Sequence, residues 1–136
     1  LVIDVGTATT FDVVTETGGY EGGIIVPGPQ GYLDFLNQNT ALLPKVNIRE
    51  NIPRSIIGKD TRQAMLIGAK LGHAAMQEGL ISQLSKEIEV QFLNKPNLIL
   101  TGGASSQNNI PNIQHRPNLT IFGLALAFQF NEISCK

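Results

Sequence analysis

The sequence predicts an α/β fold in which a mixed sheet is covered by helices. Three observations lead to this prediction. Short apolar segments bounded by glycine turns open the chain, a long stretch with helical periodicity fills its middle, and a last apolar run ends in glycines before an apolar helix. Strands followed by alternating helices and strands are typical of a sheet with helices on its faces.

Composition limits the classes of protein to consider. The 136 residues suffice for one domain with one core, and 42% hydrophobic residues with a mean hydropathy of +0.05 are typical of a soluble globular protein. A net charge of −1 provides no basic field, which argues against nucleic acid as a partner. No apolar run approaches the roughly 20 residues needed to span a bilayer, so no membrane partner is expected.

The remaining composition points to a cytoplasmic protein without a zinc site. Cys135 is the single cysteine and has no partner for an internal disulfide, which fits a reducing compartment. His73 and His115 lie too far apart in the sequence to provide zinc-ligand spacing. The chain begins with Leu1, inside an expected strand, so we expect it to be a piece of a longer protein.

The first two segments predict a hairpin with a polar turn. Residues 1–5 are expected to form a buried strand and residues 9–15 the next one, joined at Gly6. Thr7, Thr9 and Thr10 add hydroxyl groups, and successive turn amides make a concavity suited to anions. Asp4 fits beside such a turn if a cation lies between it and a phosphate, or if it orients water. An ordinary hairpin, in which these side chains only satisfy turn amides, is the alternative.

The next segments predict a third strand and a first helix. Residues 20–26 read as a strand entered through two glycines and stopped by the Pro-Gly-Pro at 27–29. Residues 30–43 show helical spacing of apolar side chains and should end at Pro44. Residues 45–59 are expected to form a surface loop.

Residues 61–80 predict the longest helix, with Asp60 or Thr61 as its N-cap. Gly79 should break it, and residues 81–92 continue as a second helix or a bent extension. One face carries small residues, which predicts close packing against another element of the domain or against a second copy of the chain. These small residues are Ala64, Gly68, Gly72 and Ala75.

The last third predicts one strand, one loop and one helix. Residues 97–100 are expected to form a buried strand that runs into Gly102 and Gly103, residues 104–118 a loop, and residues 119–130 an apolar helix. Three strands of an antiparallel meander, two helices, a strand and a final helix match one ribonuclease-H-like lobe.

Two glycine turns at strand ends suggest a nucleotide site. Strand ends at one edge of such a sheet converge on a crevice where ligands bind. Phosphates would lie at Gly6, and the base or ribose at Gly102 and Gly103. The alternative is that each glycine turn only makes a tight connection to the next strand or helix.

Other polar side chains offer no catalytic set. Asp12 and Asp34 are candidate carboxylates, and both are expected to be ordinary solvated residues. His73 is expected to be a packing or surface histidine, and His115 to be exposed in a loop. Nothing in the sequence resembles a nucleophile with its base and orienting group.

Several motifs, in the same order along the chain, resemble the type III pantothenate kinase family. The most specific is DVGTATTFD at 4–12, which is followed by GGI at 22–24, TALLP at 40–44, IGKDT at 57–61, TGG at 101–103 and LTIFGL at 119–124. The family shares the fold of sugar kinases, heat-shock chaperones and actin, with two ribonuclease-H-like lobes. Residues 1–136 resemble its C-terminal lobe as a single unit, and the N-terminal lobe is absent.

The resemblance implies site residues at four places. Asp4 matches an aspartate that binds a monovalent cation, K⁺ or NH₄⁺, and Thr61 matches a threonine that contacts pantothenate. Gly102 and Gly103 match the adenosine motif. The ATP phosphates would contact the turn formed by Gly6, Thr7, Ala8 and Thr9.

The resemblance also implies an activity and names what this chain lacks. The intact enzyme would transfer the γ-phosphate of ATP to pantothenate, the first step toward coenzyme A, with Mg²⁺ and a monovalent cation, as a homodimer. The family's Asp-x-Gly-Asn-Thr phosphate loop and its Gly-x-Asp-Arg segment, which holds the general base, would lie upstream of Leu1. Asp60 stands where the family usually has Asn.

The chain alone is therefore expected to be inactive, because phosphoryl transfer depends on positioning and charge neutralisation around the γ-phosphate. The alternative is a non-catalytic relative that serves as an accessory factor for a transcription regulator. A third possibility is a stand-alone interaction domain without nucleotide affinity.

Overall fold

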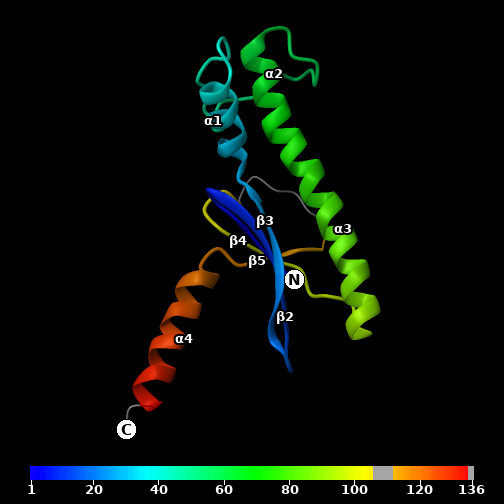
Figure 1. The fold of residues 1–136 in the computed structure, drawn as a ribbon, viewed down its shortest axis with the longest axis vertical. Helices are drawn as coiled ribbons and strands as arrows, with labels where there is room; N and C mark the ends of the chain where they lie inside the picture. The colour runs from blue at the N-terminus through cyan, green and yellow to red at the C-terminus, as the bar shows by residue number, and fades with distance from the viewer. Residues whose placement is uncertain (106–111, 135–136) are drawn as a thin grey trace.

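The computed structural model describes residues 1–105 and 112–134 and contains a five-stranded mixed sheet (Figure 1). The strand order is β3-β2-β1-β4-β5. The described strands are β1 (Val2–Val5), β2 (Ala8–Thr15), β3 (Gly19–Pro27), β4 (Ile99–Thr101) and β5 (Gln114–His115).

Strand pairing confirms the α/β prediction. The first three strands form an antiparallel meander, with a bulge between Val13 and Val14, and β4 pairs parallel to β1. The two-residue strand β5, parallel to β4, lies in a segment expected to be a loop, and two residues are too short to show an alternating pattern. Because β1 and β4 are parallel neighbours, their carboxyl ends meet at one edge of the sheet.

The helices differ from the sequence prediction at their ends and at one internal position. They are α1 (Pro29–Asn39), α2 (Thr61–Ile67), the π-helical turn η1 (Gly68–Gly72), α3 (His73–Phe92) and α4 (Leu119–Ser134). α1 ends before Pro44 because Thr40 is extended and its hydroxyl donates to the Leu36 carbonyl. The expected break at Gly79 is wrong: the irregularity is η1, and α3 continues through Gly79.

Asp60 is the N-cap of α2. Its carboxylate accepts a hydrogen bond of 2.8 Å from the Gln63 amide, which satisfies one of the free donors of the first turn. Gly58 lies so close to the backbone of Ala64 that a side chain there would collide with it. The start of α2 is thus fixed by a polar cap and a glycine contact.

Two apolar clusters form the core. The first fills the space between one face of the sheet and α3, and comprises Leu1, Ile3, Val5, Phe11, Ile81, Ile88 and Leu100. The second joins α1 to α2 and η1 through the loop after α1, and comprises Leu33, Val46, Met65, Leu66 and Ala69. In Figure 1 the continuous rod of α2, η1 and α3 runs past α1 at one end and past the sheet at the other.

The small-residue face of this rod is open to solvent. Ala64, Gly68, Gly72 and Ala75 are exposed, and nothing would lie within 4 Å of a Cβ atom placed at Gly68 or Gly72. The expectation of close packing against another element of the domain is therefore wrong in the part of the chain that the structure describes. Among residues 1–105 and 112–134, no helix is both long and apolar enough to cross a membrane.

Candidate functional site

The carboxyl ends of β1 and β4 bring polar side chains together on one face of the sheet. Asp4 pairs with Thr101 of β4 on one side and with Thr10 of β2 on the other. Cross-strand partners project to the same face, so these three side chains are neighbours. Thr101 is 2% exposed, and its hydroxyl has no partner among the described residues. At the carboxyl ends of β1 and β4 this face carries polar side chains, although Val2, Ile25 and Ile99 share it elsewhere, and the opposite face carries the apolar cluster packed on α3.

The turn between β1 and β2 is accessible, although one of its amides is already used. Thr7 and Ala8 are exposed. The Gly6 amide donates to the Ala8 carbonyl at 2.9 Å, and the Thr7 carbonyl accepts from the Gly28 amide at 2.9 Å. The expected anion concavity therefore cannot use the Gly6 amide. Thr7 as a whole remains exposed at this turn.

Gly102 is in direct contact with the carboxylate of Asp4. Its φ of 97° lies in the left-handed region, and a Cβ there would collide with Asp4 Oδ1 and the Val5 carbonyl. The chain continues past Gly103, and the Ala104 amide donates to the Val5 carbonyl at 2.9 Å. The two glycine turns thus converge at one place, as the spacing of the motifs predicts.

Thr9 lies on the opposite face from this cluster. It is fully buried, and a hydrogen bond of 2.9 Å joins its Oγ1 to His73 Nε2. Side chains alternate along β2, so Thr9 and Phe11 face α3 while Thr10 and Asp12 face the polar side. The Thr9 hydroxyl is therefore engaged inside the protein, away from the open turn.

His73 is a packing histidine, one of the two environments expected for it. It is 4% exposed and meets the ring of Tyr32 edge-on, with ring centroids 6.1 Å apart. Burial lowers the pKa of His73 below its ordinary value of 6.5, because the charged ring would lose its hydration. Gln77 is also buried, and its side-chain amide makes no hydrogen bond within the described residues.

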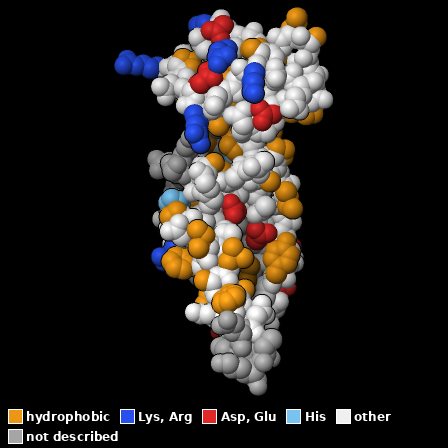
Figure 2. Space-filling model, turned by 90° about the vertical axis from the view of Figure 1, so that its left-hand side faces the viewer, with side chains coloured by type: hydrophobic (Ala, Val, Ile, Leu, Met, Phe, Trp, Pro, Cys, Tyr) orange, Lys and Arg blue, Asp and Glu red, His pale blue; other side chains and the backbone are white. Residues whose placement is uncertain are grey.

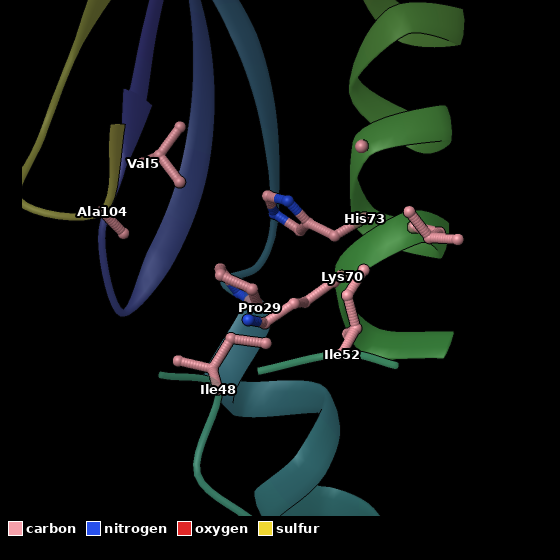
Figure 3. A pocket seen from close by; sticks show the side chains of 9 residues that line it. Val5, Pro29, Ile48, Ile52, Lys70, His73 and Ala104 are labelled. Atoms are coloured by element: carbon pink, nitrogen blue, oxygen red, sulfur yellow. The ribbon is translucent and has the colours of Figure 1, made fainter. Parts of the chain in front are cut away.

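A cavity of about 320 Å³ lies between the turn region, the start of α1 and η1 (Figure 3). His73 points from the helix toward the sheet, whereas Lys70 extends toward Pro29 at the start of α1. Lys70 Nζ donates to the Glu50 carbonyl at 2.6 Å. The remaining walls of the cavity are apolar and are formed by Val5, Pro29, Ile48, Ile52, Leu71, Ala74 and Ala104. Sequence spacing does not show this cavity, because the π turn and the loop after α1 bring its walls together.

Thr61 is not part of this cluster. It is the exposed first residue of α2 and precedes His73 by twelve residues along the rod, a rise of about 18 Å.

The other candidate side chains have local partners. Asp12 accepts from the Thr10 hydroxyl at 2.7 Å, and Asp34 accepts from the Gln30 amide at 2.8 Å. The exposed His115 is hydrogen bonded to Ser105 at 2.7 Å.

The polar cluster provides two oxygen donors of the kind that bind cations. No group of three or more His, Cys, Asp or Glu side chains that could hold a metal ion exists within the described ranges. One carboxylate, Asp4, and one unpartnered buried hydroxyl, Thr101, are hard oxygen donors of the kind that alkali and alkaline-earth cations prefer. These two side chains fit a cation held by oxygen ligands.

Comparison with known proteins gives the family. The model of the family described as type III pantothenate kinase matches residues 1–83. A type III pantothenate kinase of Rhizorhabdus wittichii is 39% identical over 94% of this chain and 49% of its own length. A type III pantothenate kinase of Rhodospirillum rubrum is 40% identical over 97% of this chain and 50% of its own length. The chain spans about half the length of the curated relatives that it matches.

A solved structure shares the fold. It is described as a candidate Baf family transcriptional activator from Campylobacter jejuni, and it matches 96% of this chain and 57% of its own chain with a TM-score of 0.57 and 19% identity. That identity shows a common fold alone. Since the family model covers more than half of the residues and the relatives match nearly all of them, the chain belongs to the type III pantothenate kinase family.

Proposed function

We propose that this chain is one lobe of an ATP-dependent kinase that transfers the γ-phosphate of ATP to pantothenate, the first step toward coenzyme A. The observation that carries the proposal is the contact between Asp4 and Gly102, which joins the two glycine turns at the carboxyl ends of parallel strands. Such an edge is the usual place for a ligand in an α/β sheet. The relatives named type III pantothenate kinase provide the reaction class.

Each part of the edge has a proposed role toward ATP. The phosphates would contact the turn at Gly6, Thr7 and Ala8, and the adenosine would lie against Gly102 and Gly103. Thr9 would support the turn from inside rather than bind the nucleotide, because its hydroxyl is bonded to His73. ATP would bring Mg²⁺, which neutralises charge on the transferring phosphoryl group. Asp4, with the hydroxyl of Thr101, would hold K⁺ or NH₄⁺.

The apolar cavity beside the turn supports a role in binding the second substrate. Pantothenate is a small carboxylate that carries two hydroxyls, an amide and a gem-dimethyl group. In a cavity of about 320 Å³, the ammonium of Lys70 would face the carboxylate and the apolar walls would contact the methyl groups. Thr61, exposed at the start of α2, would contact pantothenate from outside this cavity. A Lys70→Met variant should raise KM for pantothenate more than KM for ATP.

The general base and the first phosphate loop are to be provided by the half of the family polypeptide that this chain lacks. On this proposal residues 1–136 form a single ribonuclease-H-like lobe, and the isolated chain is inactive. We also propose that the whole protein is a cytoplasmic homodimer. The exposed small-residue face at Gly68 and Gly72 leaves room for a second copy to approach α2 and η1.

The test uses a chimera in which this chain replaces the matched region of the Rhizorhabdus wittichii relative. ADP release should require both ATP and pantothenate, and the isolated chain should give none. Asp4→Asn should lower kcat/KM at least tenfold and abolish activation by K⁺. Glu16→Gln, which removes an exposed carboxylate at the far end of β2, should leave both unchanged.

Two results would contradict this proposal. Turnover by the isolated chain would show that no missing half is needed. A folded chimera that binds neither ATP nor pantothenate would favour the accessory role in transcription, for which the name of the Campylobacter jejuni structure is a reason to test but the shared fold is not evidence.

A further inference from the structure

Ser105 and His115 form a hydrogen-bonded pair beside the glycine turn that follows β4. Ser105 Oγ lies 2.7 Å from His115 Nε2 and donates a hydrogen bond of 2.6 Å to the Gly102 carbonyl. Since that bond uses the single hydroxyl proton of Ser105, the bond to His115 must have Nε2–H as its donor. The three groups therefore form a chain in which His115 donates to Ser105 and Ser105 donates to Gly102.

The sheet does not need this chain of hydrogen bonds to hold β5 in place. The amides of Gln114 and Arg116 already donate to carbonyl groups of the β4 segment, at 2.9 and 2.8 Å. These backbone bonds pair β5 with β4. The side-chain bond of His115 extends past the end of β4 and reaches the turn, so its effect falls on the backbone of Gly102.

The direction of the Gly102 carbonyl decides where the next amide points. This carbonyl accepts two hydrogen bonds from Ser105, one from the hydroxyl and one of 3.1 Å from the backbone amide. In a planar trans peptide the C=O and the following N–H point in opposite directions, so the Gly103 amide is directed away from Ser105. Gly103 is exposed, and its amide has no hydrogen-bond partner among the described residues. The pair thus presents an unused amide donor at the surface of the turn.

The surroundings of this amide favour a neutral acceptor. Residues 96–115 contain no Lys, Arg, Asp or Glu. Figure 2 shows Lys and Arg side chains mainly toward the upper end of the molecule, at the height of α1 and α2 in Figure 1. The carboxylate of Asp4 contacts Gly102, and it disfavours an anion at this turn. An oxygen of a nucleoside therefore suits the Gly103 amide better than a phosphate oxygen.

We propose that His115 is a positioning residue for ATP. Through Ser105 it fixes the peptide between Gly102 and Gly103, so that the Gly103 amide can donate to an oxygen of the nucleoside. The inference rests on the proposed function, which places adenosine at this turn. Because His115 acts through Ser105 and takes no part in phosphoryl transfer, its loss should weaken ATP binding without slowing the chemical step.

Steady-state kinetics of the chimera with the Rhizorhabdus wittichii relative test this role. His115→Leu and Ser105→Ala should each raise KM for ATP about three- to tenfold, the effect expected of one lost hydrogen bond. KM for pantothenate and kcat should stay the same. The double variant should be no worse than Ser105→Ala alone, because both side chains act through one link.

Two single variants provide the controls. His115→Gln carries an N–H donor close to the place of Nε2–H, so it should restore KM for ATP. Gln114→Leu adds an apolar side chain at the exposed neighbouring position of β5, and should change neither KM. A merely structural role of His115 predicts a lower melting temperature of the chimera and equal effects on the two KM values.

Three results would overturn the inference. KM for ATP could be unchanged in His115→Leu, or His115→Gln could behave as His115→Leu does; either result would leave the proposed kinase function intact. A chimera with His115 and Ser105 in place that binds no ATP would overturn the proposed function as well, because the turn would then have no nucleotide to bind.

Discussion

Gly102 combines two constraints that most glycines in the chain do not share. Its φ of 97° disfavours any side chain, and the space of a Cβ is occupied by Asp4 and Val5. We predict that Gly102→Ala lowers the free energy of unfolding by about 2–4 kcal/mol, from backbone strain and overpacking together. Urea denaturation measures this.

The neighbouring Gly103 is the matched control. No atom lies within 4 Å of a Cβ placed there, and its φ is not positive, so Gly103→Ala should be nearly neutral for stability. Equal losses in the two variants would contradict the argument. If Gly102 is also a nucleotide contact, the variant should weaken ATP binding in the chimera at temperatures where it remains folded.

His73 makes the stability of the chain depend on pH. Burial lowers its pKa in the folded state below 6.5, so the unfolded chain binds a proton first as pH falls. Stability from this group is present above about pH 6.5 and decreases below it, at up to about 1.4 kcal/mol per pH unit, until the folded state also takes up the proton.

We therefore predict that the urea midpoint decreases between pH 7.5 and pH 5.5, and that His73→Gln flattens this decrease. His115→Gln removes the other histidine of the chain, which is exposed, and should keep the decrease. An unchanged slope in the His73 variant would show that carboxylates alone cause it.

Thr9 shows what residue patterns alone can and cannot give. The motif at 4–12 correctly predicts a polar turn at Gly6, but a cluster of threonines does not reveal that Thr9 and Thr10 face opposite sides of the sheet. That distinction depends on the register, in which Val5 pairs with Thr9 and Asp4 with Thr10. His73, the partner of Thr9, is 64 residues away in the sequence.

The start of α2 allows a clean test at the scale of an element. Asp60 accepts a hydrogen bond from the Gln63 amide, and Ala cannot replace that acceptor. Asp60→Ala should lower the free energy of unfolding by about 1 kcal/mol, whereas Asp60→Asn should be within a few tenths, because Asn is an equally good N-cap. Thermal or urea unfolding of the unchanged chain and of the two variants measures these differences in stability.

A larger loss in Asp60→Asn than in Asp60→Ala would show that the charge, and not the cap, is what matters at this position. This comparison is also informative for function, since the resemblance indicates Asn here. If the chain tolerates Asn without loss of stability, the aspartate is not required by the fold.

The existence of the helices and strands was largely predictable because their apolar periodicity is local. Strand β5 and the π turn η1 were not, for different reasons. β5 is two residues long and forms by pairing with β4, so its strand character comes from a tertiary contact. In η1 the glycines at 68 and 72 are equally compatible with an α-helix, so the local sequence does not indicate the wider turn.

At the scale of the molecule, the two apolar clusters predict two regions of different stability. The sheet and α3 share one cluster, while α1, α2 and η1 share the other with the loop after α1. Leu33 is fully buried in the second cluster. Leu33→Ala should cost about 2–5 kcal/mol locally, through lost contacts and a residual cavity.

Native-state hydrogen exchange measures where this cost appears. Amides of α1 and η1 should exchange faster in Leu33→Ala, and those of β1, β2 and β4 much less so, because regions can open without global unfolding. Phe35→Ala, on the exposed side of the same helix, should change neither region. Equal acceleration throughout would show a single cooperative unit.

The mixed sheet and the family are predictable from the sequence because the order of the strands and helices along the chain, and the family motifs, are local features of the sequence. The cavity and the open face of α4 do not, because each depends on what is, or is not, opposite a given surface. Lys70 reaches the cavity only where η1 lies beside the first turn of α1. A sequence that predicts an apolar helix at 119–130 cannot say that its apolar side chains stay exposed among residues 1–105 and 112–134.

The π turn η1 has a consequence for how insertions and deletions can be tolerated in this rod. A π turn holds one residue more than an α turn, so the side chains after it are rotated by about 100° relative to those before it. Removing a single residue between 68 and 72 would turn His73, Gln77 and Ile81 away from the sheet while Met65 and Leu66 kept their place against α1. The length of this short segment therefore sets which side chains of α3 face the sheet while those of α2 face α1. Inserting or deleting one residue there would lower the stability of the fold more than many substitutions would.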